Sequence, residues 1–369
     1  MFLKEISLKN VRVFNNLRTD FNPKINIIHG QNGQGKTTIL EAIYYLSITK
    51  SFRINKDAVV LKNGCDFFEI KGTFYNDSDR EVQSRIYYSS NEGKHAFINT
   101  QKVKQFSELV GLCPVILLSL DDLELTYGVP AARRRFLDIL LSQLFPGYLQ
   151  NLRSYKKCIS QKNRLLNLDS TIKENDIRIW NEQIVNYGSE VIAHRNNFVT
   201  FANEEISRFY KKISNKNEKI EITYKSTIQN IEPDLTVTDI KDSFNKTLQK
   251  SLDSEIRRKI SLIGPHKDDL DFFKNGFLFK SHGSQGENKS FLMALKTVES
   301  LYIQDISKKK PLFLLDDIFG ELDNSRVENL VLLINDEGQT FITTTDPEKF
   351  KNNFPENSKL LFLRDHSIQ

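Results

Sequence analysis

The sequence predicts an α/β fold in which a sheet domain, discontinuous along the chain, carries an inserted lobe of helices. An apolar run at residues 25–29 leads into a glycine-rich loop and then a helical pattern. A second apolar run, residues 312–315, ends in a pair of aspartates. Between them the periodicity becomes helical from Ala131. We therefore expect a head domain at residues 1–120 and 256–369, with a helical lobe at residues 121–255 inserted in it.

Within the expected head, the first part predicts an antiparallel meander. Residues 2–14 are mostly apolar and predict paired strands, and residues 67–103 alternate between apolar and polar side chains. Turns rich in polar residues interrupt the alternation at 76–79 and 91–94. A short buried strand is expected at residues 115–118.

The expected lobe has helices on either side of Pro146-Gly147, followed by a longer helix with a stripe of apolar side chains. His194 lies on that stripe, so we interpret it as a core residue and not a ligand. A loop at 211–219 and a strand at 220–224 follow.

The last third returns to strands alternating with helices, which predicts a parallel sheet split by the inserted lobe. Asn275-Gly276 between apolar runs is a strong hairpin signal. Helices are expected from Gly286 to about Ile306 and after Ser325. The expected strands are residues 312–315, 340–343 and 360–363.

Composition limits the class of protein. The 369 residues are 39% hydrophobic and 27% charged, which is typical of a soluble globular protein. The sequence has neither an apolar run of membrane-spanning length nor a signal peptide, so we expect a cytoplasmic protein without a membrane partner. Three scattered cysteines (Cys65, Cys113 and Cys158) predict neither a disulfide framework nor a metal cluster, and we interpret them as small buried side chains.

The loop at residues 30–37 has the spacing Gly-x-x-x-x-Gly-Lys-Thr of a phosphate-binding P-loop. Its glycines allow backbone N–H groups to converge on phosphate oxygens. We expect Lys36 to reach the β- and γ-phosphates and assist catalysis, and the Thr37 hydroxyl to hold Mg²⁺. The residues expected to bind ATP are Gly30, Gln31, Asn32, Gly33, Gln34, Gly35, Lys36, Thr37 and Thr38.

Asp316 and Asp317 follow the apolar run at residues 312–315. A carboxylate that ends a buried strand beside the P-loop strand holds Mg²⁺ in P-loop hydrolases. We expect Asp316 to bind the metal, directly or through water, and Asp317 to polarise the attacking water. The separation from Lys36 is much longer than in compact P-loop kinases or GTPases, so an inserted domain must occupy the gap.

Ser284 and Gly286 precede a predicted helix, where a serine and a glycine can donate to a phosphate. The pair also caps many ordinary helices. Just ahead of the carboxylate strand, it looks like the signature motif of ABC ATPases, which would contact ATP held by a second copy of the chain. Glu321-Leu322-Asp323 then takes the place of the D-loop, and Thr343-Thr344-Thr345-Asp346 ends the next strand where a switch residue is expected.

Positive charge is concentrated in residues 133–164. This segment holds eight basic residues and one acidic residue, a net charge of +7, which leaves the rest of the chain at −2 out of a total of +5. Such asymmetry suggests a polyanionic partner. Arg153, Lys157 and Arg164 share one side of a predicted helix and are the candidate DNA contacts, with a solvated charged face as the alternative. The run from Arg133 to Arg135 could instead organise the junction of head and lobe.

Taken together, these motifs resemble the RecF family, SMC-like ABC ATPases of bacterial recombinational DNA repair. The resemblance spans the chain. It is carried by the P-loop with the helix that follows it, residues 133–138, Gly264-Pro265-His266-Lys267-Asp268-Asp269-Leu270, residues 314–317 with 321–323, and residues 342–346.

The resemblance implies a head that forms a homodimer around ATP and binds DNA as that dimer, at gaps and at junctions of single- and double-stranded DNA. It further implies a weak ATPase whose slow hydrolysis releases the DNA, and a role in recombinase loading and the SOS response with the mediators RecO and RecR. The chain departs from the family at Glu287, where glutamine is usual, and at Leu120-Asp121, where Pro-Glu is usual. No residue is therefore assigned to the Q-loop.

Other functions fit less well. A transporter ATPase subunit would carry a full Leu-Ser-Gly-Gly-Gln signature, a switch histidine and a shorter gap between motifs. A small-molecule kinase would show a lid or an acceptor site. A regulatory ATPase that acts on a nuclease or toxin partner without binding DNA stays open.

Overall fold

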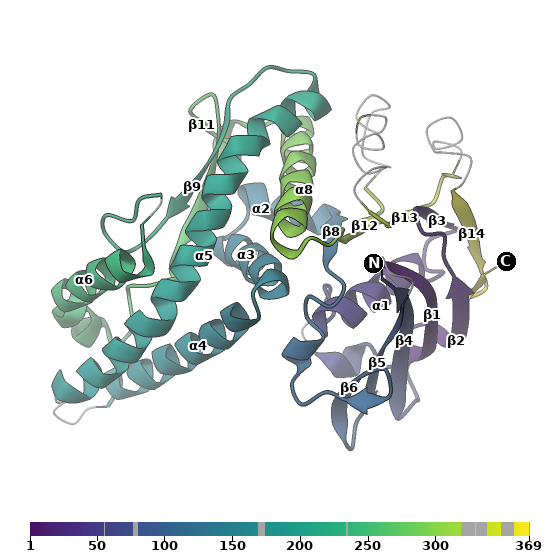
Figure 1. The fold of residues 1–369 in the computed structure, drawn as a ribbon, viewed down its shortest axis with the longest axis horizontal. Coiled ribbons are helices and arrows are strands. Elements are labelled where there is room, and N and C mark those ends of the chain that lie inside the picture. The colour runs from purple at the N-terminus through teal and green to yellow at the C-terminus, as the bar shows by residue number, and fades with distance from the viewer. Residues whose placement is uncertain are drawn as a thin grey trace. The chain divides into compact units, whose positions relative to one another are not determined.

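The structure, a computed structural model, describes residues 1–54, 56–76, 80–168, 174–233, 235–318, 329, 338–347 and 358–368. It separates into two compact units (Figure 1). The first unit comprises Met1–Leu123, Phe209–Lys216 and Gln285–Gln369, and the second comprises Glu124–Arg208 and Asn217–Ser284. No helix in the described part of the chain is long and apolar enough to cross a lipid bilayer.

The first unit contains a six-stranded sheet in the order β15-β14-β3-β13-β12-β8. Every neighbouring pair is parallel except β14 and β15, which are antiparallel. Nearly all side chains of β3, β12 and β13 are buried, as expected for parallel strands covered on both faces. Its strands are β3 (Ile25–His29), β8 (Val115–Ser119), β12 (Leu312–Asp316), β13 (Thr340–Thr344), β14 (Lys359–Arg364) and β15 (Ser367–Ile368).

This sheet confirms the predicted α/β class and its interruption in the sequence. One detail of the prediction is wrong. Strand β12, which ends in the aspartates, does not lie directly beside the P-loop strand β3, because β13 pairs with both of them. Helices α1 (Lys36–Ile48) and α8 (Gln285–Ser307) belong to the same unit, and most of their side chains are buried.

The second sheet of this unit is the predicted meander, an antiparallel sheet in the order β2-β1-β4-β5-β6-β7. Strand β4 alternates strictly between buried and half-buried residues, so one face packs on the core. In Figure 1, β1, β4 and β5 run alongside one another. Its strands are β1 (Phe2–Val11), β2 (Phe14–Asp20), β4 (Phe67–Tyr75), β5 (Glu81–Ser89), β6 (Gly93–Ile98) and β7 (Gln101–Lys102), and the short helices η1 (Asp57–Val59), η2 (Phe106–Glu108) and η3 (Leu120–Leu123) complete the unit's described elements.

One apolar core joins the two sheets of the first unit. It contains Leu3 and Phe68 from the meander, Ile39 and Ile43 from α1, and Leu314 from β12. Because α1 contributes to this core, the helix that follows the P-loop is fixed by packing along its length.

The second unit is helical at its start and mixed at its end. Its helices are α2 (Glu124–Tyr127), α3 (Pro130–Leu144), α4 (Pro146–Leu166), α5 (Glu174–Ser214, whose last turns belong to the first unit), α6 (Val237–Arg258) and α7 (Phe279–His282). Prolines begin α3 and α4, where a missing N–H costs nothing. A three-stranded sheet in the order β11-β10-β9 joins β9 (Ile220–Lys225), β10 (Asp269–Lys274) and β11 (Phe277–Leu278).

This sheet changes the domain division expected from the sequence. The predicted Asn275-Gly276 hairpin is present between β10 and β11, but β10 pairs with β9, so the second unit runs to Ser284 instead of ending at residue 255. Helix α6 has no counterpart among the predicted elements, and it begins with a capping box between Thr236 and Asp239.

The sequence also made predictions for His194, for the three cysteines and for the segment after β12. His194 is half-buried and packs against the rings of Phe145 and Tyr148, which agrees with a core position. Cys113 and Cys158 are buried, whereas Cys65 is half-buried. The expected D-loop, residues 321–323, lies outside the described residues, as does most of the helix expected after Ser325.

Candidate nucleotide-binding site

The loop between β3 and α1 depends on its glycines for its shape. Gly30, Gly33 and Gly35 all have positive φ angles of 155°, 81° and 109°. A Cβ on Gly30 would lie 2.3 Å from the carbonyl oxygen of Leu363, and a Cβ on Gly35 would lie 2.6 Å from the ring of Phe14. Helix α1 then begins without a side-chain cap, so its first N–H groups face the loop with the positive end of the helix dipole. This is the local geometry that binds phosphate.

Lys36 is held inside this loop. Its Nζ donates to the carbonyl oxygens of Gly30 at 2.7 Å and Gln31 at 3.0 Å, and the residue is only 7% exposed. Burial lowers the pKa of Lys36, while the nearby carboxylates of Asp317 and Asp316 oppose that shift. The loop thus presents a desolvated cation that is held by carbonyl groups.

Asp316 joins the P-loop helix to the sheet. Its Oδ1 accepts hydrogen bonds from Thr37 Oγ1 at 2.9 Å and from Thr343 Oγ1 at 2.7 Å. The register explains this meeting, because Asp316 on β12 lies opposite Thr343 on β13, next to the end of β3. Thr37 and Asp316, predicted together as metal ligands, are therefore in direct contact. Thr343 was not assigned to the site, although its position at the end of a strand is a usable signal.

The donor atoms around Asp316 fit Mg²⁺. One carboxylate and one hydroxyl are hard oxygen donors, and Mg²⁺ commonly takes its remaining ligands from phosphates and water. No cluster of three or more His, Cys, Asp or Glu side chains that could hold a metal occurs among the described residues, so nothing suggests a fully protein-bound ion there. Burial raises the pKa of Asp316, while the hydroxyls of Thr343 and Thr37 act against this shift.

Asp317 has a different environment from its neighbour. Its backbone is left-handed, with a φ of 52°, and its N–H donates to Thr343 Oγ1 at 3.0 Å. The residue is exposed, whereas Asp316 is half-buried. The turn between the two residues thus separates a carboxylate bound to hydroxyls from one that faces solvent.

An ion pair between a half-buried arginine and a buried glutamate supports the P-loop helix from the side. Glu41, on α1 and 1% exposed, accepts hydrogen bonds from Arg12 Nε at 3.1 Å and Arg12 Nη2 at 2.8 Å. Ser51 also donates to Glu41. This pair was missed in the sequence because two residues of opposite charge at that separation carry no local pattern.

The expected signature motif lies at the start of α8. Ser284 is exposed just before the helix, and Gly286 is half-buried in its first turn. Glu287 forms an ion pair with Lys216 at 3.4 Å between Oε1 and Nζ. Glu287 is the residue that departs from the usual glutamine. Its pairing with Lys216 partly neutralises its negative charge, which reduces the repulsion that its carboxylate would exert on a nearby anion.

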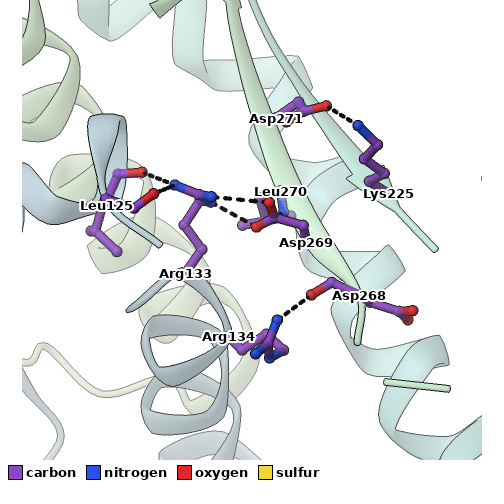
Figure 2. Close-up of polar contacts among 9 residues, drawn as sticks. Leu125, Arg133, Arg134, Lys225, Asp268, Asp269, Leu270 and Asp271 are labelled. Carbon is purple, nitrogen blue, oxygen red and sulfur yellow. Dashed lines mark hydrogen bonds and ion pairs between the residues drawn. The ribbon is translucent and has the colours of Figure 1, made fainter. Parts of the chain in front are cut away.

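The basic segment at residues 133–164 divides into buried and exposed charges. Arg133 forms a two-pronged ion pair with Asp269, from Nε to Oδ1 at 2.7 Å and from Nη2 to Oδ2 at 2.9 Å, and it also donates to the Leu125 carbonyl oxygen (Figure 2). Arg134 donates to the carbonyl oxygen of Asp268 (Figure 2). Lys162, fully buried, pairs with Glu255 at 2.7 Å. These side chains organise the second unit, so the +7 charge overstates the exposed positive surface.

Arg153, Lys157 and Arg164, the predicted DNA contacts, are all exposed on α4. None of them forms an ion pair with another described residue. Their guanidinium and ammonium groups are therefore accessible to a polyanion.

Comparisons with known proteins agree with this geometry. The family described as "RecF/RecN/SMC N terminal domain" matches residues 2–368. A protein of Chloroherpeton thalassium named DNA replication and repair protein RecF is 37% identical over 330 residues, which cover 88% of this chain and 90% of that protein. A protein of the same name from Streptococcus thermophilus strain LMD-9 is 34% identical over 369 residues, covering 100% and 98% of the two chains.

Solved structures give the same assignment. One described as the recombination mediator protein RecF with ATP in the RecFOR pathway matches with a TM-score of 0.89 and 29% identity, over 100% of this chain and 97% of that one. An SMC head bound to the C-terminal winged-helix domain of ScpA matches at a TM-score of 0.58 and 15% identity, over 100% and 96% of the two chains, and shares the fold. The chain therefore belongs to the RecF family, with the ABC-like ATPase head that the family shares with SMC proteins.

Proposed function

We propose that this protein is a DNA repair ATPase in which ATP controls dimerisation and the dimer clamps DNA. The observation that carries the proposal is the meeting of Lys36, Thr37 and Asp316 around one phosphate-binding loop. Membership in the RecF family supports the role in DNA replication and repair. The ATP-bound RecF structure supports ATP as the nucleotide.

The P-loop accounts for ATP binding. The N–H groups of residues 30–38 and the ammonium group of Lys36 receive the phosphates, and Lys36 exchanges its carbonyl partners for phosphate oxygens. Thr37 and Asp316 would hold Mg²⁺, which would neutralise charge that develops on the phosphates. Asp317, exposed beyond the strand end, orients and deprotonates the attacking water. Ser284 and Gly286 contact the nucleotide of a second copy, which makes dimerisation depend on ATP.

DNA binding is assigned to the exposed face of α4. Arg153, Lys157 and Arg164 contact phosphates and contribute affinity without reading sequence. Hydrolysis is slow and dissolves the dimer, which releases DNA. RecO and RecR are the expected partners in recombinase loading during the SOS response, in the cytoplasm, because relatives in the family include a RecFOR-pathway mediator.

Sedimentation of the Lys36→Ala variant tests the coupling. The variant loses the cation that the loop holds for phosphate, so we expect ATP to leave it monomeric and unable to retain DNA, whereas ATP dimerises the parent protein and ADP does not. Lys24→Ala, which removes an exposed lysine ahead of β3, is the matched control and should behave as the parent. A Lys36→Ala protein that still dimerises and holds DNA with ATP would overturn the proposal.

The same experiment distinguishes the regulatory alternative. A parent protein that dimerises with ATP but does not cosediment with single-stranded, duplex or gapped DNA would be an ATPase acting on a protein partner.

A further inference from the structure

The hairpin formed by β14 and β15 contacts the P-loop, and the site described above gives it no role. Strand β14 runs parallel to β3, with Phe362 opposite His29, so both strands end beside the loop. The hairpin then turns through Asp365 and His366, whose φ angles of 49° and 57° are both left-handed, as in a two-residue hairpin turn.

His366 at the tip of this hairpin makes two contacts with one P-loop residue. Its backbone N–H donates to Gln34 Oε1 at 3.3 Å, and its Nδ1 lies 3.1 Å from the Gln34 carbonyl oxygen. A carbonyl oxygen only accepts hydrogen bonds, so Nδ1 carries the proton and donates it. The imidazole also meets the ring of Phe14 edge-on at 6.4 Å between ring centres, and Phe14 closes the space next to Gly35.

Gln34 has a glycine on each side. It lies between Gly33 and Gly35, both with positive φ angles, so the backbone on either side of it has the freedom of glycine. A Cβ on Gly33 would meet no atom within 4 Å, so packing does not restrain that position. If the loop is not ordered before ATP binds, binding must order it, and the entropy lost in doing so lowers the affinity for ATP.

We infer that His366 is a positioning residue for the nucleotide, which fixes the carbonyl group and side chain of Gln34 so that the loop's N–H groups are aligned before ATP arrives. This inference rests on the proposed function, because it assumes that the P-loop binds ATP. His366 acts through Gln34 and touches no phosphate itself.

Two substitutions at His366 isolate the ring donor. Glycine and asparagine both tolerate the left-handed backbone, but only asparagine keeps a donor near the position of Nδ1. We expect His366→Gly to bind ATP about 3- to 10-fold more weakly, the effect of losing one ordinary hydrogen bond. His366→Asn should stay within about 2-fold of the parent, on the same reasoning. In steady-state hydrolysis, His366→Gly should raise KM and leave kcat unchanged.

A matched control and a direct readout complete the test. Ser367→Ala removes a hairpin hydrogen bond to the Arg364 carbonyl oxygen without touching the P-loop, so its ATP affinity should equal that of the parent. Hydrogen exchange of the loop amides without nucleotide should be faster in His366→Gly than in His366→Asn.

The outcomes separate the two proposals. If the parent protein does not bind ATP, the proposed function fails. The inference about His366 fails if the parent binds ATP and His366→Gly binds it equally well. It also fails if His366→Asn is as weak as His366→Gly, or if Ser367→Ala is as weak as either.

Discussion

Adjacent aspartates at the end of β12 are suited to different tasks because the backbone turns between them. Asp316 is engaged by the hydroxyls of Thr37 and Thr343, whereas Asp317 has a left-handed backbone and an exposed side chain. The sequence placed both residues correctly at a strand end. The sequence also places Thr343 at a strand end, but its contact with Asp316 could not be predicted, because that contact depends on the order of strands in the sheet.

The first residue-scale prediction concerns Asp317→Asn. Asparagine cannot accept the proton of water, so we expect kcat for ATP hydrolysis to fall by about 100-fold or more. ATP binding should persist, because Thr37, Lys36 and Asp316 are unchanged, and the ATP-induced dimer should last longer. Single-turnover hydrolysis and nucleotide titration measure the two effects. Parent-like hydrolysis by Asp317→Asn would remove this residue from the role of base.

A second residue-scale prediction is a pH dependence from the second unit. Burial lowers the pKa of His266 to about 4, and its Nδ1 lies 2.5 Å from the Tyr155 hydroxyl oxygen. The unfolded chain therefore binds a proton more readily than the native protein between pH of about 6.5 and about 4. Stability from neutral His266 is fully present above that window and is lost as the pH falls through it.

The free energy of unfolding tests this directly. His266→Gln keeps a polar side chain that does not titrate, so the loss of stability between pH 7 and pH 5 should be smaller than in the parent by about 2 kcal/mol. Urea unfolding of both proteins at the two pH values provides the comparison. An equal loss in both would assign the acid sensitivity to other groups.

At the scale of elements, the sequence predicted those with a strong local signal. The P-loop, the alternating strands of the meander, the break between helices at Pro146-Gly147 and the Asn275-Gly276 turn each depend on a few neighbouring residues. Helix α6 was missed although Thr236 and Asp239 mark its start, and β10 was assigned to the wrong unit. Strand pairing joins residues far apart in the chain, so β9 and β10 could not be recognised as partners from either segment alone.

The Arg133–Asp269 ion pair gives the prediction at this scale. From α3, Arg133 reaches β10 through Asp269 and α2 through the Leu125 carbonyl oxygen, and its side chain is 5% exposed. Arg133→Met leaves the Asp269 carboxylate without its partner, so we expect the second unit to lose about 3 kcal/mol of stability. Arg153→Met, on the exposed face of α4, should change stability by less than about 0.5 kcal/mol. Urea unfolding of each variant is the measurement, and equal stability in the two variants would contradict the assignment.

At the scale of the whole molecule, the uneven charge suggested a polyanionic partner but could not indicate which side chains would contact it. Arg133 and Lys162 belong to buried ion pairs, and Lys156 pairs with Asp138 at 3.4 Å. Sequence counts cannot separate these from accessible cations, because burial is set by packing of distant segments. Arg153, Lys157 and Arg164 are among the accessible cations. We therefore expect the electrostatic contribution to DNA affinity to depend on these three side chains.

The salt dependence of DNA binding tests that assignment quantitatively. Each phosphate contact adds about 0.9 to the slope of log affinity against log salt concentration on duplex DNA, because bound counterions are released. Replacing Arg153, Lys157 and Arg164 together by glutamine should therefore reduce the slope by about 2 to 3 and weaken binding with little regard to sequence. A second triple variant, with glutamine at Lys241, Lys246 and Lys250 of α6, removes the same charge from another helix and should keep the parent slope. If both triple variants lowered the slope equally, the protein's net charge, and not the face of α4, would account for its attraction to DNA.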